Sequence, residues 1–159
     1  MNKIIIFFLI FLMLLVLWTD RPVASLTGGF SDVPEGYWAK KQIEYLVSKK
    51  IEVGFPDESF KPEQGVTQEQ FTKMVVIAKG LSEYKPSKQT FRDVSKDRWS
   101  YGFIEAAAKA GYIKGDPNDN FGPDDPITRE QLAVILIRVL GKESEANDPN
   151  LVIATFSND

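Results

Sequence analysis

The residues best suited to chemistry stand at the start of two short segments with one shared pattern. The chain reads "ITREQL" from Ile127 to Leu132 and "VTQEQF" from Val66 to Phe71. In each segment a threonine precedes a glutamine by three residues, which is the pattern of a helix capping box. The second segment has Arg129 where the first has Gln68. A guanidinium in the first turn of a helix suits an anion such as a carboxylate, because unpaired N–H groups and the helix dipole favour negative charge there.

The composition argues against an enzyme. The 159 residues include no cysteine and no histidine, so the chain lacks thiolates, disulfides and the commonest general base and transition-metal ligand. A catalyst would have to work with carboxylates, lysine or tyrosine alone. We therefore expect neither catalytic residues nor a cofactor.

The two segments belong to a longer repeat with an offset of 61 residues. "FSDVPEGYW", Phe30 to Trp38, overlays "FRDVSKDRW", Phe91 to Trp99. Farther along, "FKP" at Phe60 to Pro62 overlays "FGP" at Phe121 to Pro123. Matches spread over the whole length at one offset indicate a duplicated unit.

Each repeat is predicted to form a helix, a long loop and a second helix. Apolar residues recur at helical spacing from Trp38 to Val47 and from Tyr101 to Ala108. The middle segments, "GFPDESFKPEQG" and "GDPNDNFGPDDP", are rich in turn-forming residues. Phe60 and Phe121 are the expected apolar anchors of these loops.

The second helices have clear sequence boundaries. Thr67 and Thr128 are the predicted N-caps, and Gly80 and Gly141 are predicted to take positive φ after the last turn. Each helix has an apolar stripe that a single helix pair cannot bury, so the repeats must pack on one another. With two repeats, we expect one such stripe to stay exposed, formed by Leu132, Ile135 and Leu136.

The N-terminal residues are typical of a secretory signal peptide. Lys3 precedes an apolar run of 15 residues, Ile4 to Trp18, and "VAS" at Val23 to Ser25 has the small residues of a cleavage site. The run covers roughly 22 Å as a helix, less than the roughly 30 Å of a bilayer core. We expect cleavage after Ser25; an uncleaved membrane anchor is the alternative.

The charge balance limits the classes of partner that the chain is expected to bind. Without residues 1–25 the chain keeps 17 basic and 21 acidic residues, a net charge of −4. Such a chain has no basic field for nucleic acid. Export without cysteine fits a bacterial protein better than a disulfide-rich extracellular module.

These residues together resemble a known family. The elements F-x-D-V, a following tryptophan, G-x-P-x-x-x-F-x-P and I-T-R-E resemble the S-layer homology module. The resemblance covers most of the chain after the signal peptide. It divides the sequence into a signal peptide (1–25), a first module (26–81), a linker (82–90), a second module (91–141), a linker (142–154) and the start of a third module (155–159).

The resemblance implies a fold and a role. The fold would be mainly α, with helix–loop–helix modules packing as part of a pseudo-threefold helical bundle. Grooves between modules would bind a pyruvylated secondary cell-wall polysaccharide, and this contact would anchor an exported protein to a Gram-positive-type wall without any enzymatic activity. The alternative is a module that only self-associates or binds other chains, without binding a glycan.

The resemblance also implies ligand-binding residues. A pyruvyl group presents a carboxylate, which Arg129 would hold. Gln68 can donate a hydrogen bond but carries no charge, so the first module would bind less strongly. The implied ligand-binding residues are Arg129, Thr128, Glu130, Trp38, Trp99, Asp57 and Gln68. Several of them have a structural alternative: the glutamate can serve the helix dipole, and the tryptophans can be core residues.

The second loop departs from the family pattern. Asn118 stands where the first loop has Asp57, and Asp116 stands at the preceding aromatic position, so its sugar contacts are in doubt. Asp116, Asn118 and Asn120 also match the first ligand positions of an EF-hand loop. Phe121 stands where that loop needs glycine, so a metal site is not expected.

Overall fold

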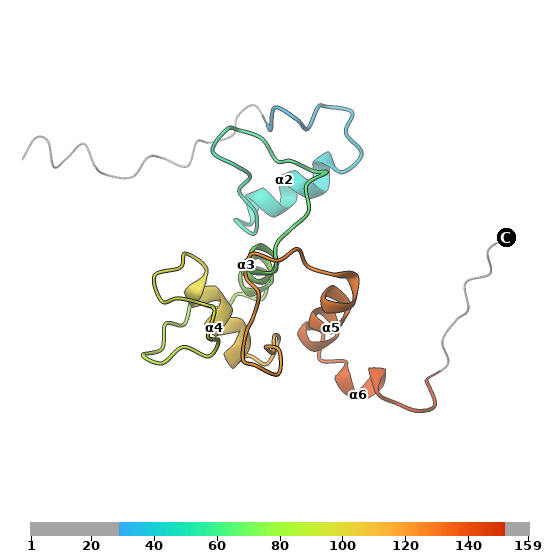
Figure 1. Ribbon diagram of the computed structural model, residues 1–159. Helices are drawn as coiled ribbons and strands as arrows, with labels where there is room; N and C mark the ends of the chain where they lie inside the picture. The colour runs from blue at the N-terminus through green and yellow to red at the C-terminus, as the bar shows by residue number, and fades with distance from the viewer. Residues whose placement is uncertain (1–28, 152–159) are drawn as a thin grey trace, which may run out of the picture.

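The computed structural model of the protein describes residues 29–151 (Figure 1). This part of the chain is mainly helical, as predicted. The signal peptide and the start of a third module, both predicted from the sequence, lie outside the described residues. Between residues 29 and 151, every helix is too short or too polar to span a bilayer. The helices are α2 (Lys40–Ser48), α3 (Gln68–Ala78), α4 (Tyr101–Lys109), α5 (Arg129–Val139) and α6 (Glu143–Ala146).

The second helix of each repeat begins and ends as predicted. The Thr67 hydroxyl accepts a hydrogen bond from the Gln70 N–H, and the Gln70 side chain accepts one from the Thr67 N–H at 3.0 Å. Thr128 forms the same capping box at the start of α5. Gly80 and Gly141 both have φ of 67°. The same local sequence signals therefore fix α3 and α5 in the same way.

Each long loop is fastened to the start of its own repeat by one aspartate. The Asp32 carboxylate accepts hydrogen bonds from the Phe60 N–H (2.8 Å) and the Lys61 N–H (2.7 Å). The Phe60 ring packs on Phe30 with its centroid at 5.2 Å. In the second repeat the corresponding residues are Asp93, Phe121, Gly122 and Phe91. The predicted role of the two phenylalanines as anchors is confirmed.

The main core joins the two repeats. Helix α3, from the first repeat, packs against α4, the first helix of the second repeat. Figure 1 shows α3 between α4 and α5. The core holds Val75 and Val76 of α3, Ile104 and Ala107 of α4, and Ile135 of α5. A smaller cluster of Phe30, Val33 and Ile43 lies within the first repeat. The packing unit is thus offset from the sequence repeat.

The exposed stripe of α5 differs from the prediction. Ile135 was expected on the open side, but it is 7% exposed because it joins the core on α3. Leu132 is half-buried, whereas Leu136 is exposed as expected. The exposed apolar side chains of α5 and its end are Val134, Leu136 and Leu140. The open face is therefore rotated relative to the predicted stripe.

Candidate functional site

A groove lies at the junction of the two repeats. It has a volume of about 620 Å³ and is lined by the loop of the first repeat, by α3 and by Trp99 at the start of the second repeat. We call it groove 1, and its lining includes Gly54, Phe55, Phe60, Lys61, Val66, Gln70, Lys73, Met74 and Trp99. Its volume is in the range of small-molecule sites.

Two lysines and aromatic faces meet in groove 1. The Lys73 ammonium lies 5.9 Å from the ring centroid of Trp99. The Lys61 ammonium lies 4.1 Å from the Phe55 ring centroid and 3.2 Å from the Asp57 carboxylate. The Trp99 side chain is half exposed, at 52%, so part of the indole is open to solvent. An aromatic face beside cations can stack on a sugar ring and attract an acidic substituent.

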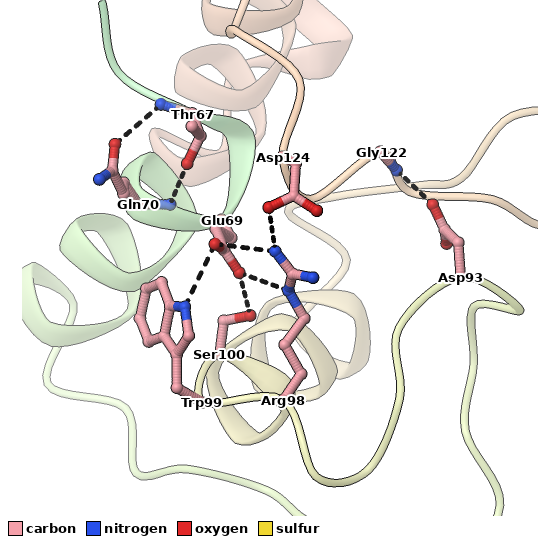
Figure 2. Close-up of polar contacts among 9 residues, drawn as sticks. All are labelled: Thr67, Glu69, Gln70, Asp93, Arg98, Trp99, Ser100, Gly122 and Asp124. Atoms are coloured by element: carbon pink, nitrogen blue, oxygen red, sulfur yellow. Dashed lines mark hydrogen bonds and ion pairs between the residues drawn. The ribbon is translucent and has the colours of Figure 1, made fainter. Parts of the chain in front are cut away.

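The Trp99 indole is held in place by Glu69 from the other repeat (Figure 2). Its Nε1–H donates to the Glu69 carboxylate at 3.2 Å. Arg98 donates two hydrogen bonds to the same carboxylate, at 2.7 and 3.0 Å, and the Ser100 hydroxyl donates one at 2.5 Å. The Glu69 side chain is only 8% exposed. A nearly buried carboxylate therefore orients the groove's aromatic wall.

Arg98 joins three segments through this network. Besides Glu69, its guanidinium contacts the carboxylate of Asp124 in the second loop. These two acceptors raise the pKa of Arg98 above its ordinary value, with the hydrogen bond to Glu69 as the larger cause. The bidentate geometry is the one that arginine favours with a carboxylate.

The first turn of α3 is occupied by the protein itself. The Gln68 N–H donates to the Asp125 carbonyl at 2.9 Å, and the Glu69 N–H donates to the Pro123 carbonyl at 3.2 Å. At α5, the N–H groups of Arg129 and Glu130 have no such partner within residues 29–151. Of the two capped helix starts in residues 29–151, the one in the second repeat thus keeps free N–H groups toward which an anion would be attracted.

A second groove occupies the equivalent place in the second repeat. It has a volume of about 350 Å³, and we call it groove 2. Gly115, Phe121, Gln131, Val134 and Ile135 in its lining stand 61 residues after Gly54, Phe60, Gln70, Lys73 and Met74 of groove 1. The cation at Lys73 is thus replaced by the apolar Val134. Arg138 and Lys114 line groove 2 from other positions.

Three of the predicted site residues line a groove. Trp99 lines groove 1, whereas Gln68 and Glu130 line groove 2. Gln68 is buried below the second loop, and Glu130 is exposed at the start of α5. Their role in binding a ligand stays a prediction.

The other four predicted residues lie outside both linings. Thr128 and Arg129 are exposed beside Glu130, with the Thr128 hydroxyl engaged in its capping box. Trp38 is 85% exposed at the start of α2. Asp57 accepts hydrogen bonds from the hydroxyl and N–H of Ser59, and the hydroxyl is the main cause of its lowered pKa.

The carboxylate that a calcium site would need in the second loop is used by the loop itself. Asp116 accepts hydrogen bonds from the N–H groups of Asn118 and Asn120, each at 2.8 Å. These bonds, that of Asn120 first, lower the pKa of Asp116. They account for the aspartate as a turn residue.

The Glu69 network and the two lysines of groove 1 were not predicted from the sequence. The available signal was a break in the repeat, because Arg98 and Ser100 stand where the first repeat has Tyr37 and Ala39. A charged residue present in one copy alone indicates a partner that only this copy meets.

Comparison with known proteins agrees with this architecture. Residues 29–72 and 90–133 each match the S-layer homology domain, and together these segments cover more than half of the chain. The chain belongs to the S-layer homology domain family. The family's modules are non-catalytic and anchor proteins at the cell wall, which places this chain among exported proteins of the cell surface.

The relatives are much longer than this chain. An S-layer protein of Bacillus licheniformis is 36% identical over 116 residues, 73% of this chain and 13% of that protein. S-layer protein EA1 of Bacillus anthracis is 32% identical over 135 residues, 85% of this chain and 15% of that protein. An exoglucanase of Acetivibrio thermocellus is 35% identical over 146 residues, 91% of this chain and 13% of that protein. The S-layer homology chain therefore spans a small part of each of these relatives.

Proposed function

We propose that the chain anchors an exported protein to the cell wall by binding an acidic polysaccharide that carries pyruvyl groups, and that groove 1 is a binding site. The observation that carries this proposal is the junction groove of about 620 Å³ with Trp99 and two lysines in its walls. A sugar ring stacks on the Trp99 indole. Lys73 and Lys61 attract the pyruvyl carboxylate.

Local charge supports an acidic ligand over a neutral one. Residues 26–159 have a net charge of −4, yet the two lysines of groove 1 lie beside aromatic rings. Two acids are close by: Asp57 pairs with Lys61, and Glu52 lines the groove with its carboxylate accepting the N–H groups of Val53 and Gly54. Lys73 has no carboxylate within ion-pair distance among residues 29–151 and is the freer cation for a ligand.

Arg129 is the second proposed contact to a carboxylate. Its guanidinium is exposed and forms no ion pair within the described part of the chain. The Ile127 N–H donates to the Val66 carbonyl at 3.0 Å, and Val66 lines groove 1, so α5 begins close to this groove. The free N–H groups of that helix start add to the attraction for an anion.

The test is binding of the exported chain to isolated walls with intact polysaccharide and to walls stripped of pyruvyl groups. Lys73→Ala and Arg129→Ala should each weaken binding by roughly 2 kcal/mol, because a carboxylate loses its partner in a partly desolvated groove. The matched controls are Lys88→Ala and Arg92→Ala, which remove exposed cations away from both grooves. Circular dichroism checks that each variant folds. Equal binding to stripped walls, or equal losses in variants and controls, would refute the carboxylate contact.

Gln68 is a poor site for gaining affinity. Gln68 was expected to bind an acidic ligand more weakly than Arg129 does, because it carries no charge. On that expectation, a Gln68→Arg variant would raise the affinity. The side chain is buried, with its amide nitrogen close to Gly122 in the second loop. A longer, charged side chain there would displace that loop, so we propose Gln68 as a supporting residue of groove 2.

Self-association is the second candidate function, and the exposed face of α5 favours it. Leu140 at the end of this helix is 66% exposed, and Leu136, four residues before it on the same side of the helix, is also exposed. Neighbouring exposed apolar side chains of this kind can mark an interaction surface. A chain that only associates would bind intact and stripped walls equally.

A further inference from the structure

The Glu69 carboxylate behind the aromatic wall of groove 1 is fully hydrogen-bonded. Three consecutive side chains, those of Arg98, Trp99 and Ser100, converge on it (Figure 2). Its Oε1 accepts from Trp99 at 3.2 Å and from Arg98 at 3.0 Å, and its Oε2 accepts from Arg98 at 2.7 Å and from Ser100 at 2.5 Å. A carboxylate accepts about four such bonds, so these three residues use its whole capacity.

The charge of Glu69 would oppose an acidic ligand if it stood alone. The Glu69 side chain is 8% exposed, and its Oε1 lies 3.2 Å from the indole nitrogen of Trp99, which lines groove 1. Water screens a charge poorly where it has little access, so the field of this acid extends farther than that of a surface acid. Trp99 and Ser100 donate hydrogen bonds but carry no charge. Arg98 is the cation that the structure pairs with Glu69.

Arg98 has a second acidic partner, Asp124, in a different environment. The Asp124 side chain is 78% exposed, so water screens most of its charge. Two carboxylates and one guanidinium leave a net charge of −1, and this surplus lies on the exposed acid rather than beside the indole. Removing the charge of Asp124 should therefore act in the opposite direction from removing the charge of Arg98.

The charges that line groove 1 follow the same arrangement. Glu52 accepts two backbone N–H groups, and Asp57 pairs with Lys61. Lys73, by contrast, forms no ion pair among residues 29–151 and lies 5.9 Å from the Trp99 ring centroid. The indole thus stands between a cation that is free for a ligand and an acid that Arg98 neutralises.

We propose that Arg98 is a positioning residue that sets the selectivity of groove 1. It holds Glu69 in place and balances its charge, so the wall formed by Trp99 accepts an acidic sugar in preference to a neutral one. Arg98 is not among the residues that line the groove, and it acts through Glu69. The use of this selectivity for a wall polysaccharide rests on the proposed function of groove 1.

The first experiment measures the charge at the indole with no polysaccharide present. In a Trp38→Phe background, Trp99 is the one tryptophan after Ser25, so its emission reports on groove 1. Quenching by iodide, an anion, is compared with quenching by neutral acrylamide at constant ionic strength. Arg98→Gln should lower the ratio of iodide to acrylamide quenching by about threefold, because a positive charge close to the indole is lost. Arg92→Gln, which removes an exposed arginine of the same repeat, should leave the ratio unchanged.

Two further variants test the sign of the effect. Asp124→Asn removes the exposed acid and should raise the ratio of iodide to acrylamide quenching. Glu69→Gln combined with Arg98→Gln removes both charges of the bidentate pair and should return the ratio toward the parent value. A ratio that folded Arg98→Gln leaves unchanged would overturn the proposal. Should that variant fail to fold by circular dichroism, a ratio that does not rise in Asp124→Asn would overturn it instead.

Arg98→Lys separates the charge from the geometry. Lysine keeps the positive charge but cannot donate two parallel hydrogen bonds to Glu69. The ratio of iodide to acrylamide quenching should therefore stay near the parent value, while quenching by acrylamide itself should increase as the indole is held less firmly. A ratio that falls as far in Arg98→Lys as in Arg98→Gln would contradict the charge-balancing role.

The second experiment measures selectivity on isolated walls with intact polysaccharide and on walls stripped of pyruvyl groups. Arg98→Gln should lower the ratio of the two affinities by about fivefold, and Arg92→Gln should not change it. A merely structural loss would weaken binding to both walls in proportion and leave the ratio unchanged, which would refute the selectivity. Equal binding of the parent chain to both walls would refute the proposed function, while the quenching result still decides the charge-balancing role of Arg98.

Discussion

Helices α3 and α5 have the same length and the same capping box, yet they differ in what covers them. Helix α3 buries Glu69, Thr72 and Val76, while at the equivalent positions of α5 Glu130 and Ala133 are exposed and Ile137 is half-buried. A capping box needs only residues that lie three apart in the chain, so it forms in both repeats. Burial depends on the neighbour, and within residues 29–151 only α3 has a first helix from a following repeat beside it.

The largest difference in the loss of stability between matched variants is expected at Glu69 and Glu130. Glu69→Ala removes the acceptor of Arg98, Trp99 and Ser100, and it should lower the free energy of unfolding by about 3 kcal/mol, because a mostly buried charge and hydroxyl lose their partner. Glu130→Ala, the matched change on α5, should stay within about 0.5 kcal/mol in the monomer. Urea denaturation at low protein concentration measures both. Similar losses for the two variants would mean that α5 has a covering partner within its own chain.

A smaller difference in the loss of stability is expected at Val76 and its equivalent, Ile137. Val76 is fully buried, and Val76→Ala should cost about 2 kcal/mol through lost burial and the remaining cavity. Its equivalent, Ile137, is half-buried, and Ile137→Ala should cost about 1 kcal/mol although it removes more atoms. Thermal unfolding of the two variants provides the comparison. A larger loss for Ile137→Ala would contradict the assignment of the open face.

The smallest effect concerns a feature that the two repeats share. The N–H of Phe60, more than that of Lys61, lowers the pKa of Asp32 by donating to its carboxylate. A lowered pKa means that the carboxylate's contribution to stability is present above its unfolded pKa, about 3.9, and is lost as the pH falls through the folded value. The amide signals of Phe60 and Lys61 in NMR spectra should therefore shift only below about pH 4.

Asp32→Asn is the matched control for this titration. An amide keeps one acceptor oxygen, so the loop of the first repeat should loosen slightly at neutral pH and lose its acid transition. A transition near neutral pH in the parent chain, or an unchanged acid transition in the variant, would contradict the role of Asp32.

The helices, their caps and the loop anchors were predictable from the sequence because each depends on residues close together in the chain. Thr67 and Gln70 lie three residues apart, and the periodicity of α4 is visible within its own span. The faces that these helices bury were less predictable. Ile135 was expected to be exposed, since the sequence of α5 does not state which side meets α3.

The candidate site was predictable only where a residue acts by itself. Trp99 was among the ligand-binding residues that the family resemblance implied, and it does line groove 1. Lys61 and Lys73 were not, because a lysine on a loop and one on a helix look like ordinary surface residues until the fold brings them to one groove. The pairing of Glu69 with Arg98 spans 29 residues and crosses the linker, so no local pattern encodes it.

The offset between the core and the repeat has a consequence for how this protein can be cut and recombined. A break in the linker between residues 82 and 90 follows the boundary of the repeats, but it separates α3 from α4 and Glu69 from Arg98. Neither half then keeps the main core. A fragment that runs from the start of α3 through the second loop retains the α3–α4 contact intact. The part that can be transferred to another protein as a folded unit is therefore the junction between two repeats. A single repeat cut at its sequence boundaries would lack half of the main core.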